Sequence, residues 1–280
     1  MPVPLGDEEY RSWAEWLAEE YGMRWGPEKR EILRSRLEPR RAATGSESFE
    51  QLLFLLRFAP DGEAEREHLV AHLTNNESYF CRERDALEVI RTEIFPALAA
   101  AAGGGGEVRM LSAACASGEE AYTLSMLAAA SGAFRRGSVR VMGLDLDPDA
   151  LARAGAATYG EHAFRGTDDA FRERYFDSGA EGRWTVRPEY RRQVRFRREN
   201  LVRPGWSAIL PPQHLVLCRN VMIYFDARGV QRCAEELYRA LAPGGYLFLG
   251  HAETLREVPV PFATERRPGA VFYRRPPEDR

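Results

Sequence analysis

A run of glycines divides this chain into two parts with different hydrophobic rhythms. Before the stretch Gly103–Gly106, apolar residues recur every three or four positions; after it, short apolar runs alternate with helical segments. The first rhythm is typical of amphipathic helices, and the second of strands joined by helices. Strands that alternate with helices form a mostly parallel sheet with helices on both faces. The sequence therefore predicts an all-helical front, a flexible glycine joint and an α/β domain.

Five helices are expected before the joint. One should begin at Pro27, because proline fits the first turn of a helix. Another should begin at Ser48, which stands in capping-box spacing with Gln51. The helices should end or kink at residues that disfavour a helix interior, namely Gly22, Pro39 and Pro96.

Beyond the joint, strands and helices are expected in turn. Short alternating runs over 183–197 predict a small β-hairpin unit inserted among them. Strands are predicted over 108–112, 139–144, 215–218, 246–249 and 270–274, helices over 119–130, 148–156 and 227–241, and a turn at Gly244-Gly245.

The composition excludes several classes of protein. A formal net charge of -3 gives the whole chain no attraction to nucleic acid or to an acidic membrane. The chain has no apolar run of about 18 residues that would span a membrane, and it lacks the basic start of a secretory signal. Four scattered cysteines without a CxxC pair suit a reducing cytoplasm, and no metal-ligand spacing is present. We therefore expect a cytoplasmic protein without membrane insertion and without a metal.

The stretch LSAACASGEEAY, residues 111–122, has the composition of a ligand-binding loop. A strand ends there in small side chains, Gly118 permits a tight turn, and a helix begins at Glu119. Ligands of open α/β sheets bind beyond the carboxyl ends of such strands. The loop is neither a GxGxxG nor a P-loop, and Glu119 and Glu120 would repel a diphosphate. Either these acids favour a ligand with an amine or sulfonium group, or they only neutralise the helix dipole.

A further carboxylate stands at the end of the second strand. Asp145 closes the run VMGLD, in a position where acids commonly accept hydrogen bonds from ribose hydroxyls. The alternative is that Asp145 or Asp147 only caps the helix that begins near Pro148. Asp147 suits the cap better, which leaves Asp145 for the ligand.

Polar residues interrupt the apolar run HLVLCRNVMIYFD, residues 214–226. Burying Arg219 or Asn220 without a partner would cost roughly 2–7 kcal/mol. Either the strand ends there at a ligand, or internal hydrogen bonds satisfy the two side chains. An acidic helix start, a ribose-binding acid and no phosphate site favour a nucleoside with an amino-acid tail, and S-adenosylmethionine fits that description.

Six segments, in order, resemble the CheR family of chemotaxis-receptor glutamate methyltransferases. They are TNNESYFCRE (74–83), SGEEAY (117–122), LDLD (144–147), ENL (199–201), CRNVMIYFD (218–226) and GHAE (250–253), and the resemblance covers nearly the whole chain. Cys81 stands where a second Phe is usual, which is expected to loosen the packing behind Arg82. Ser117 and Ala121 replace the usual Thr and Pro and remove no reactive group.

The resemblance implies a Rossmann-like methyltransferase fold with a small β-subdomain at about 177–197 and an all-α domain in front. The expected bounds are 1–75 for the helical domain, 76–106 for a linker helix that carries Asn76–Arg82, and 107–280 for the catalytic domain. Tyr224 is implied to lie beside the transferred methyl group. Contacts with S-adenosylmethionine, and with its product S-adenosylhomocysteine, are implied for Asn76, Ser78, Arg82, Glu120, Asp145, Asn200, Leu201, Arg219 and Asn220.

The implied reaction is methyl esterification of glutamate side chains on chemoreceptor cytoplasmic domains. A glutamate carboxylate, with a reference pKa of about 4.3, is already ionised at neutral pH and needs no general base. Arg82 is expected to hold this carboxylate in line, and Tyr224 to orient the carboxylate or the methyl group. Without the resemblance, an ion pair of Arg82 with Glu83 or Asp85 and a core position for Tyr224 would be the plainer interpretations.

The resemblance also implies a partner, the acidic helical bundle of a receptor. A run of charged residues is usually a solvated helix face. If it instead binds the receptor, the docking residues would be Lys29, Arg30, Arg34 and Arg36. Some family members bind a receptor C-terminal peptide on the β-subdomain. The stretch 177–190 is short here, and Pro188 would remove an edge donor, so no dependence on such a peptide is expected.

Two alternatives to a receptor methyltransferase are considered. One is a related methyltransferase with another acceptor, such as a non-receptor signalling protein. The other is a non-catalytic module that binds S-adenosylmethionine in a signalling array, which loss of both Arg82 and Tyr224 would favour. The sequence has no basic face interleaved with aromatic residues, so it gives no indication that the protein binds RNA or another nucleic acid.

Overall fold

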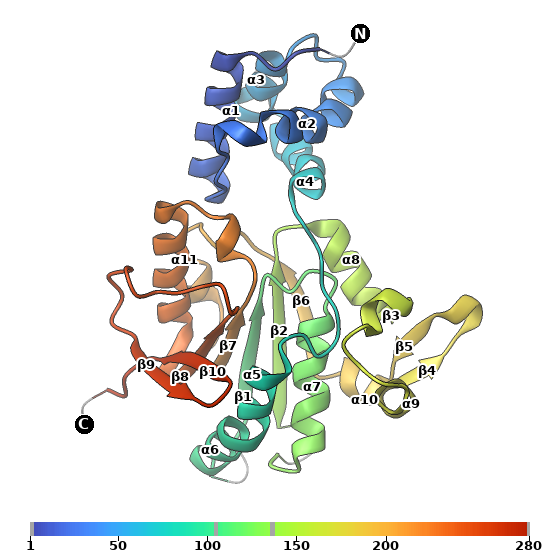
Figure 1. Ribbon diagram of the computed structural model, residues 1–280, viewed down its shortest axis with the longest axis vertical. Helices are drawn as coiled ribbons and strands as arrows, with labels where there is room; N and C mark the ends of the chain where they lie inside the picture. Colours follow the sequence, from blue (N-terminus) through green and yellow to red (C-terminus); the bar gives the residue numbers. More distant parts are fainter. Residues whose placement is uncertain (1–2, 104–105, 135–137, 279–280) are drawn as a thin grey trace.

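A layer of helices stands over one end of a mixed sheet in this computed structural model (Figure 1). The structure describes residues 3–103, 106–134 and 138–278. Two glycines of the expected joint, Gly104 and Gly105, lie outside these ranges. The predicted order of a helical front and an α/β domain is confirmed, whereas the bounds 1–75, 76–106 and 107–280 stay a prediction.

One apolar cluster holds the N-terminal helices together. Trp13 and Leu52 are completely buried in it, and the indole N–H of Trp13 donates to the carbonyl of Phe49 over 3.0 Å. The hydroxyl of Ser48 accepts from the backbone N–H of Gln51 over 3.1 Å, which confirms the predicted cap. The elements are α1 (Asp7–Tyr21), a 3-10 turn (Pro27–Lys29), α2 (Arg30–Thr44), α3 (Phe49–Phe58) and α4 (Gly62–Leu73).

The predicted stop before Pro39 is wrong, because α2 continues to Thr44. Proline in a helix interior removes one hydrogen bond and crowds the preceding turn, at a cost of about 3 kcal/mol. A contact beyond the proline ties the last turns of α2 to a neighbouring helix: the guanidinium of Arg40 donates to both carboxylate oxygens of Glu65 in α4, over 2.6 and 2.7 Å. A rule for isolated helices does not include such a contact between two helices.

An extended segment and an irregular helix connect the two layers. Residues 74–83 run from α4 down to α5 (Arg84–Val89) in Figure 1. A π-helical turn (Ile90–Ile94) then leads into α6 (Phe95–Ala101). Pro96 occupies the first turn of α6, where its missing N–H breaks no helical hydrogen bond. The irregularity predicted at this proline is confirmed.

Seven strands form the main sheet in the order β6-β2-β1-β7-β8-β10-β9. Neighbours among the first five run parallel, while β10 runs antiparallel to both β8 and β9. The carboxyl ends of the parallel strands therefore meet beneath the N-terminal helices (Figure 1). The strands are β1 (Val108–Ala113), β2 (Val139–Asp145), β6 (Val194–Arg198), β7 (Gln213–Cys218), β8 (Leu241–Leu249), β9 (Ala263–Arg267) and β10 (Ala270–Arg274).

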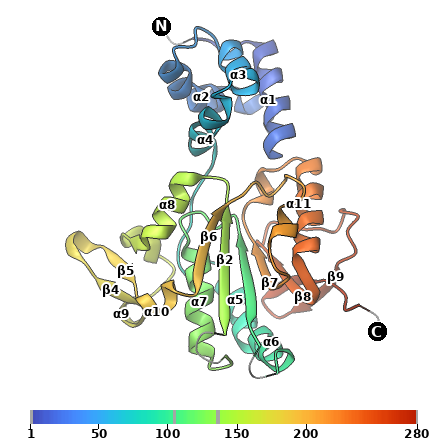
Figure 2. The same cartoon turned by 180° about the vertical axis from the view of Figure 1, so that it is seen from behind.

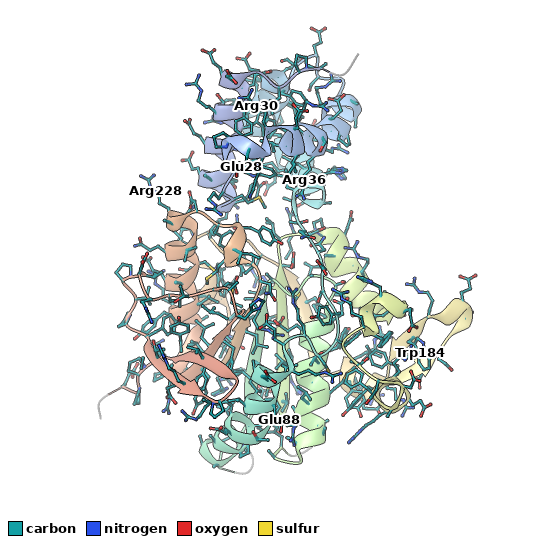
Figure 3. All side chains as sticks on the ribbon, in the orientation of Figure 1. Glu28, Arg30, Arg36, Glu88, Trp184 and Arg228 are labelled. Atoms are coloured by element: carbon teal, nitrogen blue, oxygen red, sulfur yellow. The ribbon has the colours of Figure 1, made fainter. Side chains whose placement is uncertain are left out.

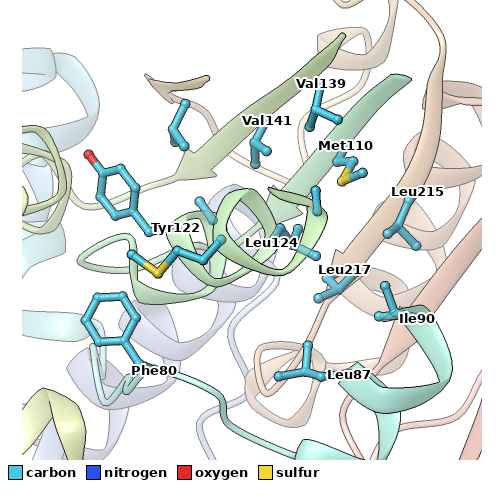
Figure 4. Close-up of a cluster of buried hydrophobic side chains, with 14 of the residues drawn as sticks. Phe80, Leu87, Ile90, Met110, Tyr122, Leu124, Val139, Val141, Leu215 and Leu217 are labelled. Carbon is cyan, nitrogen blue, oxygen red and sulfur yellow. The ribbon is translucent and has the colours of Figure 1, made fainter. Parts of the chain in front are cut away.

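Alternate residues of the central strands face two different apolar cores. Met110 and Leu217 belong to the core that includes α7 (Glu119–Ser131), part of which Figure 4 shows. Leu111 and Val216 belong to the core that includes α11 (Ala227–Ala240), which lies on the face seen in Figure 2. This period of two explains the continuous apolar runs, since both faces of the sheet are covered. A third helix, α8 (Pro148–Ala156), follows β2.

The predicted hairpin over 183–197 is wrong. Its first half, β5 (Trp184–Val186), belongs to a separate sheet, whereas its second half, β6, is an edge strand of the main sheet. An alternating pattern shows that a strand is half-buried, but not which sheet it joins. Pro188 begins a short helix instead of interrupting a strand. Figure 3 labels Trp184 on the small sheet, whose order is β3-β5-β4, with β3 (Thr158–Tyr159), β4 (Phe176–Ser178), α9 (Asp169–Tyr175) and α10 (Pro188–Arg191) around it.

Two other strand features differ from the prediction. The strand expected at 246–249 begins at Leu241, so Gly244 and Gly245 lie inside β8, where its pairing with β7 is irregular. Gly244 has a φ of 78°, which glycine adopts without strain. No strand is predicted for β9, because its sequence, ATERR, is polar and largely exposed.

Candidate active site

A cavity of about 330 Å³ lies between the N-terminal helices and the carboxyl ends of β1, β2 and β7. Its walls come from both parts of the chain, and include Met23, Trp25 and Leu73 of the helical layer. Every residue predicted for the reaction site lines this cavity: Asn76, Ser78, Arg82, Glu120, Asp145, Asn200, Leu201, Arg219, Asn220 and Tyr224.

The loop after β1 exposes its backbone to the cavity. Ala114 and Ala116 line the cavity and have φ angles of 63° and 46°, a left-handed conformation that non-glycine residues rarely adopt. Gly118 ends the loop with a φ of 92°, and a Cβ there would lie 2.9 Å from Ala154 Cβ. Strain of this kind costs energy and concentrates at functional sites. The small side chains leave space for a ligand beside the chain.

Asp145 holds this loop in place and also faces the cavity. Its carboxylate accepts the backbone N–H of Ala116 over 2.7 Å and that of Asp147 over 2.9 Å. Burial raises the pKa of Asp145, although these backbone hydrogen bonds act in the opposite direction. Asp147 caps α8 by accepting from the N–H groups of Asp149 and Ala150, as predicted. Each Asp145 oxygen keeps a lone pair for a ligand hydroxyl.

A buried ion pair joins two of the predicted residues. The Arg219 side chain donates to Glu120 over 2.7 Å, and the two side chains are 3% and 13% exposed. Ser112 donates to the other Glu120 oxygen over 2.7 Å, and Arg219 also donates to the carbonyl of Arg82 over 2.9 Å. Arg219, which is distant from Glu120 in the sequence, therefore neutralises it. The charge of Glu120 is then not free to attract a sulfonium.

The neighbouring acid, Glu119, has another role. Its carboxylate is buried and accepts from the hydroxyl of Ser117 over 3.0 Å. Burial raises its pKa, against the effect of hydrogen bonds from its own backbone, Ser117 and Ser78. Ser78 thus connects the linker segment to the start of α7.

Asn220 leaves one polar atom without a partner. Its side-chain N–H donates to Glu83 over 3.2 Å, but its Oδ1 is buried and accepts no hydrogen bond in the part of the chain that the structure describes. The residue has a φ of 61°. The two interpretations of the polar interruption after β7 therefore apply to different residues. Internal hydrogen bonds satisfy Arg219, whereas Asn220, which lines the cavity, keeps a buried amide oxygen without a donor among the described residues.

Arg82 has no carboxylate partner among the described residues. Its guanidinium donates to the carbonyl of Glu77 over 3.1 Å and lies 5.6 Å from the ring centre of Tyr79. The ion pair with Glu83 or Asp85 does not form, because Glu83 interacts with Arg219 and Asn220 instead. Cys81, at a φ of 58°, packs partly buried against the core behind Arg82.

Tyr224 is 38% exposed at the cavity and is not a core aromatic. It ends a 3-10 turn (Met222–Tyr224) after β7, and the helical layer holds it: Arg24 N–H donates to its carbonyl over 2.8 Å. Beside it, Met23 pairs with Phe225 as an isolated antiparallel bridge, and Asp226 N–H donates to the carbonyl of Gly22 over 2.8 Å.

The amides of Asn76 and Asn200 are used within the protein. The Asn76 side chain donates to Asp147. The Asn200 side chain donates to the carbonyl of Glu20 over 2.8 Å and accepts from Val202 N–H over 3.1 Å. Both residues line the cavity while they join its two walls, and Leu201 beside Asn200 is buried.

The four predicted docking residues do not form one surface. Lys29 and Arg36 line the cavity, and Arg36 also donates to the carbonyl of Leu73. Arg30 pairs with Asp7, and Arg34 pairs with Glu31 over 2.9 Å. Figure 3 labels Arg30 and Arg36 at different levels of the helical layer. Two of the four charges therefore lie on the cavity wall.

Sequence reasoning missed three groups of residues at this site. Residues 23–25 supply a wall from the helical layer. Glu83 receives hydrogen bonds from Asn220 and His251, which, with Arg219, hold its pKa below its ordinary value despite the opposing effect of burial. Glu253 binds the backbone after Arg219. The signal for Glu253 was present in the segment GHAE, to which no role was given.

The donor set fits a nucleoside with an amino-acid tail. Asp145 offers lone pairs near a backbone-lined loop, Asn220 Oδ1 lacks a donor, and the buried indole N–H of Trp25 lacks an acceptor among the described residues. Within residues 3–103, 106–134 and 138–278, no three His, Cys, Asp or Glu side chains converge to hold a metal ion. In the same ranges, no helix is both long and apolar enough to cross a bilayer.

Two family models match the chain. The one described as "CheR methyltransferase, SAM binding domain" matches residues 76–270, and the one described as "CheR methyltransferase, all-alpha domain" matches residues 8–74. Together they account for both layers of the fold and for the cavity between them.

Curated relatives agree with these matches. The chain is 34% identical over 259 residues to Chemotaxis protein methyltransferase 1 of Pseudomonas aeruginosa, which covers 90% of this chain and 92% of that protein. It is 31% identical over 279 residues to Chemotaxis protein methyltransferase Cher2 of Pseudomonas putida, which covers 96% and 99%. It is 36% identical over 217 residues to the Probable biofilm formation methyltransferase WspC of Pseudomonas putida, covering 78% of this chain and 50% of that protein.

Proposed function

Because the chain belongs to the CheR methyltransferase family, we propose that it esterifies glutamate side chains in the cytoplasmic domains of chemoreceptors. The family match establishes the coarser statement, an S-adenosylmethionine-dependent methyltransferase with an all-α domain in front of an α/β domain. The observation that carries the finer statement is Arg82, a cavity-lining guanidinium without a carboxylate partner among the described residues.

S-adenosylmethionine supplies a methyl group on a positively charged sulfur. We assign its hydroxyl groups to Asp145, whose lone pairs face the cavity beside the loop Ala114–Ala116. Asn220 Oδ1 would accept one of its N–H donors. Glu120 and Arg219 act as a neutral buried pair that fixes the floor of the site, while Asn76, Ser78, Asn200 and Leu201 complete its walls.

Glu77, Glu120, Asp145 and Glu199 line the cavity, but the proposed substrate needs none of these carboxylates as a general base. No histidine lines it within the described ranges. The one cysteine on its wall, Cys115, has a pKa raised well above its ordinary value by burial, so its thiol stays protonated. A glutamate substrate needs no base, because its carboxylate is ionised at neutral pH. A hydroxyl or amine substrate would need one.

Arg82 and Tyr224 would position the substrate carboxylate. A guanidinium with free donors binds a carboxylate through two parallel hydrogen bonds, which fixes its direction as well as its place. Tyr224 is held by Arg24 on its backbone and by Asn75 on its hydroxyl, so both ends of the residue are fixed at the cavity. Positioning of this kind can supply roughly 7–11 kcal/mol of the barrier reduction.

We propose that the receptor docks at the cavity mouth and that the enzyme works in the cytoplasm. Lys29 is half-exposed there and forms no ion pair with any described residue, so it remains available to an acidic helical bundle. We still propose that the enzyme does not depend on a receptor C-terminal peptide. Pro188 no longer supports this proposal, because it begins a helix and does not interrupt a strand. What supports it is the shortness of β4, three residues, which offers few edge hydrogen bonds to an added strand.

The second candidate function is methylation of a related receptor. The match to a probable biofilm formation methyltransferase favours a signalling receptor whose output is not motility. This alternative leaves the chemistry unchanged and alters only the receptor that carries the glutamate.

The test is transfer of a labelled methyl group from S-adenosylmethionine to purified receptor cytoplasmic domains. Label that mild alkali releases as methanol identifies a carboxyl ester, since methyl ethers and methylamines resist this treatment. Glutamate-to-aspartate replacement at the labelled position should abolish the signal. Label that resists alkali, or that persists without any glutamate, contradicts the proposal.

A further inference from the structure

Glu253 binds the backbone of the segment that carries Asn220 and Tyr224. Its carboxylate accepts the N–H groups of Asn220 over 2.8 Å, Val221 over 2.8 Å and Met222 over 2.7 Å. A fourth N–H, from Gly250, reaches it over 2.7 Å. Glu253 and Gly250 lie in the loop after β8, whereas the other donors, which also include Ile223 N–H at 3.4 Å, follow β7. One carboxylate therefore fastens two neighbouring loops to each other.

Glycine at position 250 makes this arrangement possible. A Cβ on Gly250 would lie 2.8 Å from Glu253 Oε2 and 2.9 Å from the backbone nitrogen of Asn220. The N–H of Glu253 donates back to the carbonyl of Gly250 over 2.9 Å. The segment GHAE thus forms a closed turn that presents a carboxylate to the neighbouring loop.

The donors that Glu253 binds are those that the segment itself leaves unsatisfied. Asn220 has a φ of 61°, a left-handed conformation that asparagine tolerates better than most residues and that the hydrogen bond from its N–H to Glu253 helps to fix. The 3-10 turn Met222–Tyr224 has no side-chain cap of its own, and its first N–H groups need acceptors. A carboxylate at this point satisfies the N–H groups and favours the turn that ends in Tyr224.

We propose that Glu253 is a positioning residue for methyl transfer: it sets the direction of Asn220 and Tyr224 without touching substrate or cofactor. Glu253 does not line the cavity, so its effect must pass through the backbone that it holds. This inference rests on the proposed function, because it assigns Tyr224 to the reacting groups.

The first experiment compares Glu253→Gln with Glu257→Gln, an exposed acid in the same loop. The glutamine keeps the size of the side chain but turns an N–H₂ group toward backbone donors. We expect kcat to fall at least tenfold in Glu253→Gln and to change less than twofold in Glu257→Gln. Affinity for S-adenosylhomocysteine should weaken by a smaller factor than kcat, because the Asp145 side of the site is untouched.

The second experiment repeats Glu253→Gln in a Tyr224→Phe background. If Glu253 acts by positioning Tyr224, its replacement should lower kcat less than threefold once the hydroxyl is gone. An equal loss in both backgrounds, or no loss in either, overturns the inference. If Glu253→Gln does not fold, Gly250→Ala replaces it in the same comparison. The added Cβ displaces the Glu253 carboxylate without removing it.

The wild-type enzyme separates this inference from the proposed function. Failure of the wild-type protein to form an alkali-labile methyl ester on any receptor glutamate contradicts the proposed function. An active wild-type enzyme with an unimpaired Glu253→Gln variant contradicts only the role of Glu253.

Discussion

The hydroxyl of Tyr224 accepts a hydrogen bond of 3.0 Å from the side-chain amide of Asn75, a residue 149 positions earlier in the chain. The tyrosine follows a strand of the sheet, and the asparagine begins the segment that leaves the helical layer. The orientation of Tyr224, which we propose positions the substrate carboxylate, thus depends on both layers of the fold.

Asn75→Ala should lower kcat by roughly threefold to tenfold, the range expected for loss of one neutral hydrogen bond. Initial rates at saturating S-adenosylmethionine and receptor measure this effect. In a Tyr224→Phe background the same replacement should have no further effect, since its partner is absent. A large rise in the Kd for S-adenosylhomocysteine would contradict a role restricted to Tyr224.

Arg82→Ala should reduce methyl transfer far more than cofactor binding. Its proposed partner is the incoming carboxylate, and a hydrogen bond to a charged group contributes roughly 1.5–3 kcal/mol, or about 10- to 150-fold in rate. Turnover on a receptor domain and calorimetry with S-adenosylhomocysteine give the two quantities. Arg256→Ala, an exposed arginine, is the control. Near-normal turnover of Arg82→Ala would remove this residue from the mechanism.

Asp145 should make cofactor affinity depend on pH. Burial raises its pKa, so its ionised form is lost at a higher pH than in an exposed aspartate. A ligand hydroxyl needs the ionised acceptor, so affinity should fall as the pH drops through this raised pKa and recover above it. Calorimetry across a pH series measures this dependence, and Asp145→Asn should flatten it. Asp145→Ala should weaken binding by roughly 1.5–3 kcal/mol at neutral pH.

Breaking the Glu120–Arg219 pair should destabilise the protein strongly. Removing one partner leaves a buried charge, at a cost of roughly 3–5 kcal/mol, whereas replacing both by apolar residues costs much less. Urea unfolding of Glu120→Leu, Arg219→Met and the double variant tests this order. Glu235→Ala, which removes an exposed pair with Arg239, should cost less than about 1 kcal/mol. Additive losses in the double variant would show that the pair is not coupled.

Lys29→Glu should raise the KM for the receptor more than Arg34→Glu. Lys29 lines the cavity without an ion pair among the described residues, while Arg34 pairs with Glu31. The receptor KM should also rise with salt, because exposed charges are screened beyond about 8 Å at physiological ionic strength. Steady-state kinetics at several salt concentrations measures both effects, and equal effects of the two variants would place docking elsewhere.

Much of the fold follows from local patterns. The buried strands β1 and β7, the cap at Ser48 and the helix start at Pro148 are each set by neighbouring residues, so the sequence predicts them. Pro39 and β6 are different, because contacts between distant segments decide whether a helix continues and which sheet a strand joins.

The site also divides into features that local sequence predicts and contacts between distant segments that it does not. The residues predicted for the reaction site all line one cavity, since strand ends that meet at one edge carry most of them. Their partners could not be predicted: Glu120 binds Arg219, and Asn76 binds Asp147, across separations that no spacing rule covers. Glu83 and Glu253 were missed for the same reason, because a charged side chain in a loop gives no signal of the backbone it will meet.

The bridge between Met23 and Phe225 also bears on the synthesis of the enzyme and on the exchange of segments between relatives. During synthesis, Met23 leaves the ribosome long before Phe225 exists, so the helical layer emerges with that backbone edge unpaired. A hybrid that joins another relative's helices to this sheet would need a tight fit where a Cβ on Gly22 would lie 3.0 Å from Gly229 Cα. Without that fit the two layers would not meet at the cavity, so the close approach of Gly22 to Gly229 is one of the contacts that restrict the exchange of whole segments between relatives.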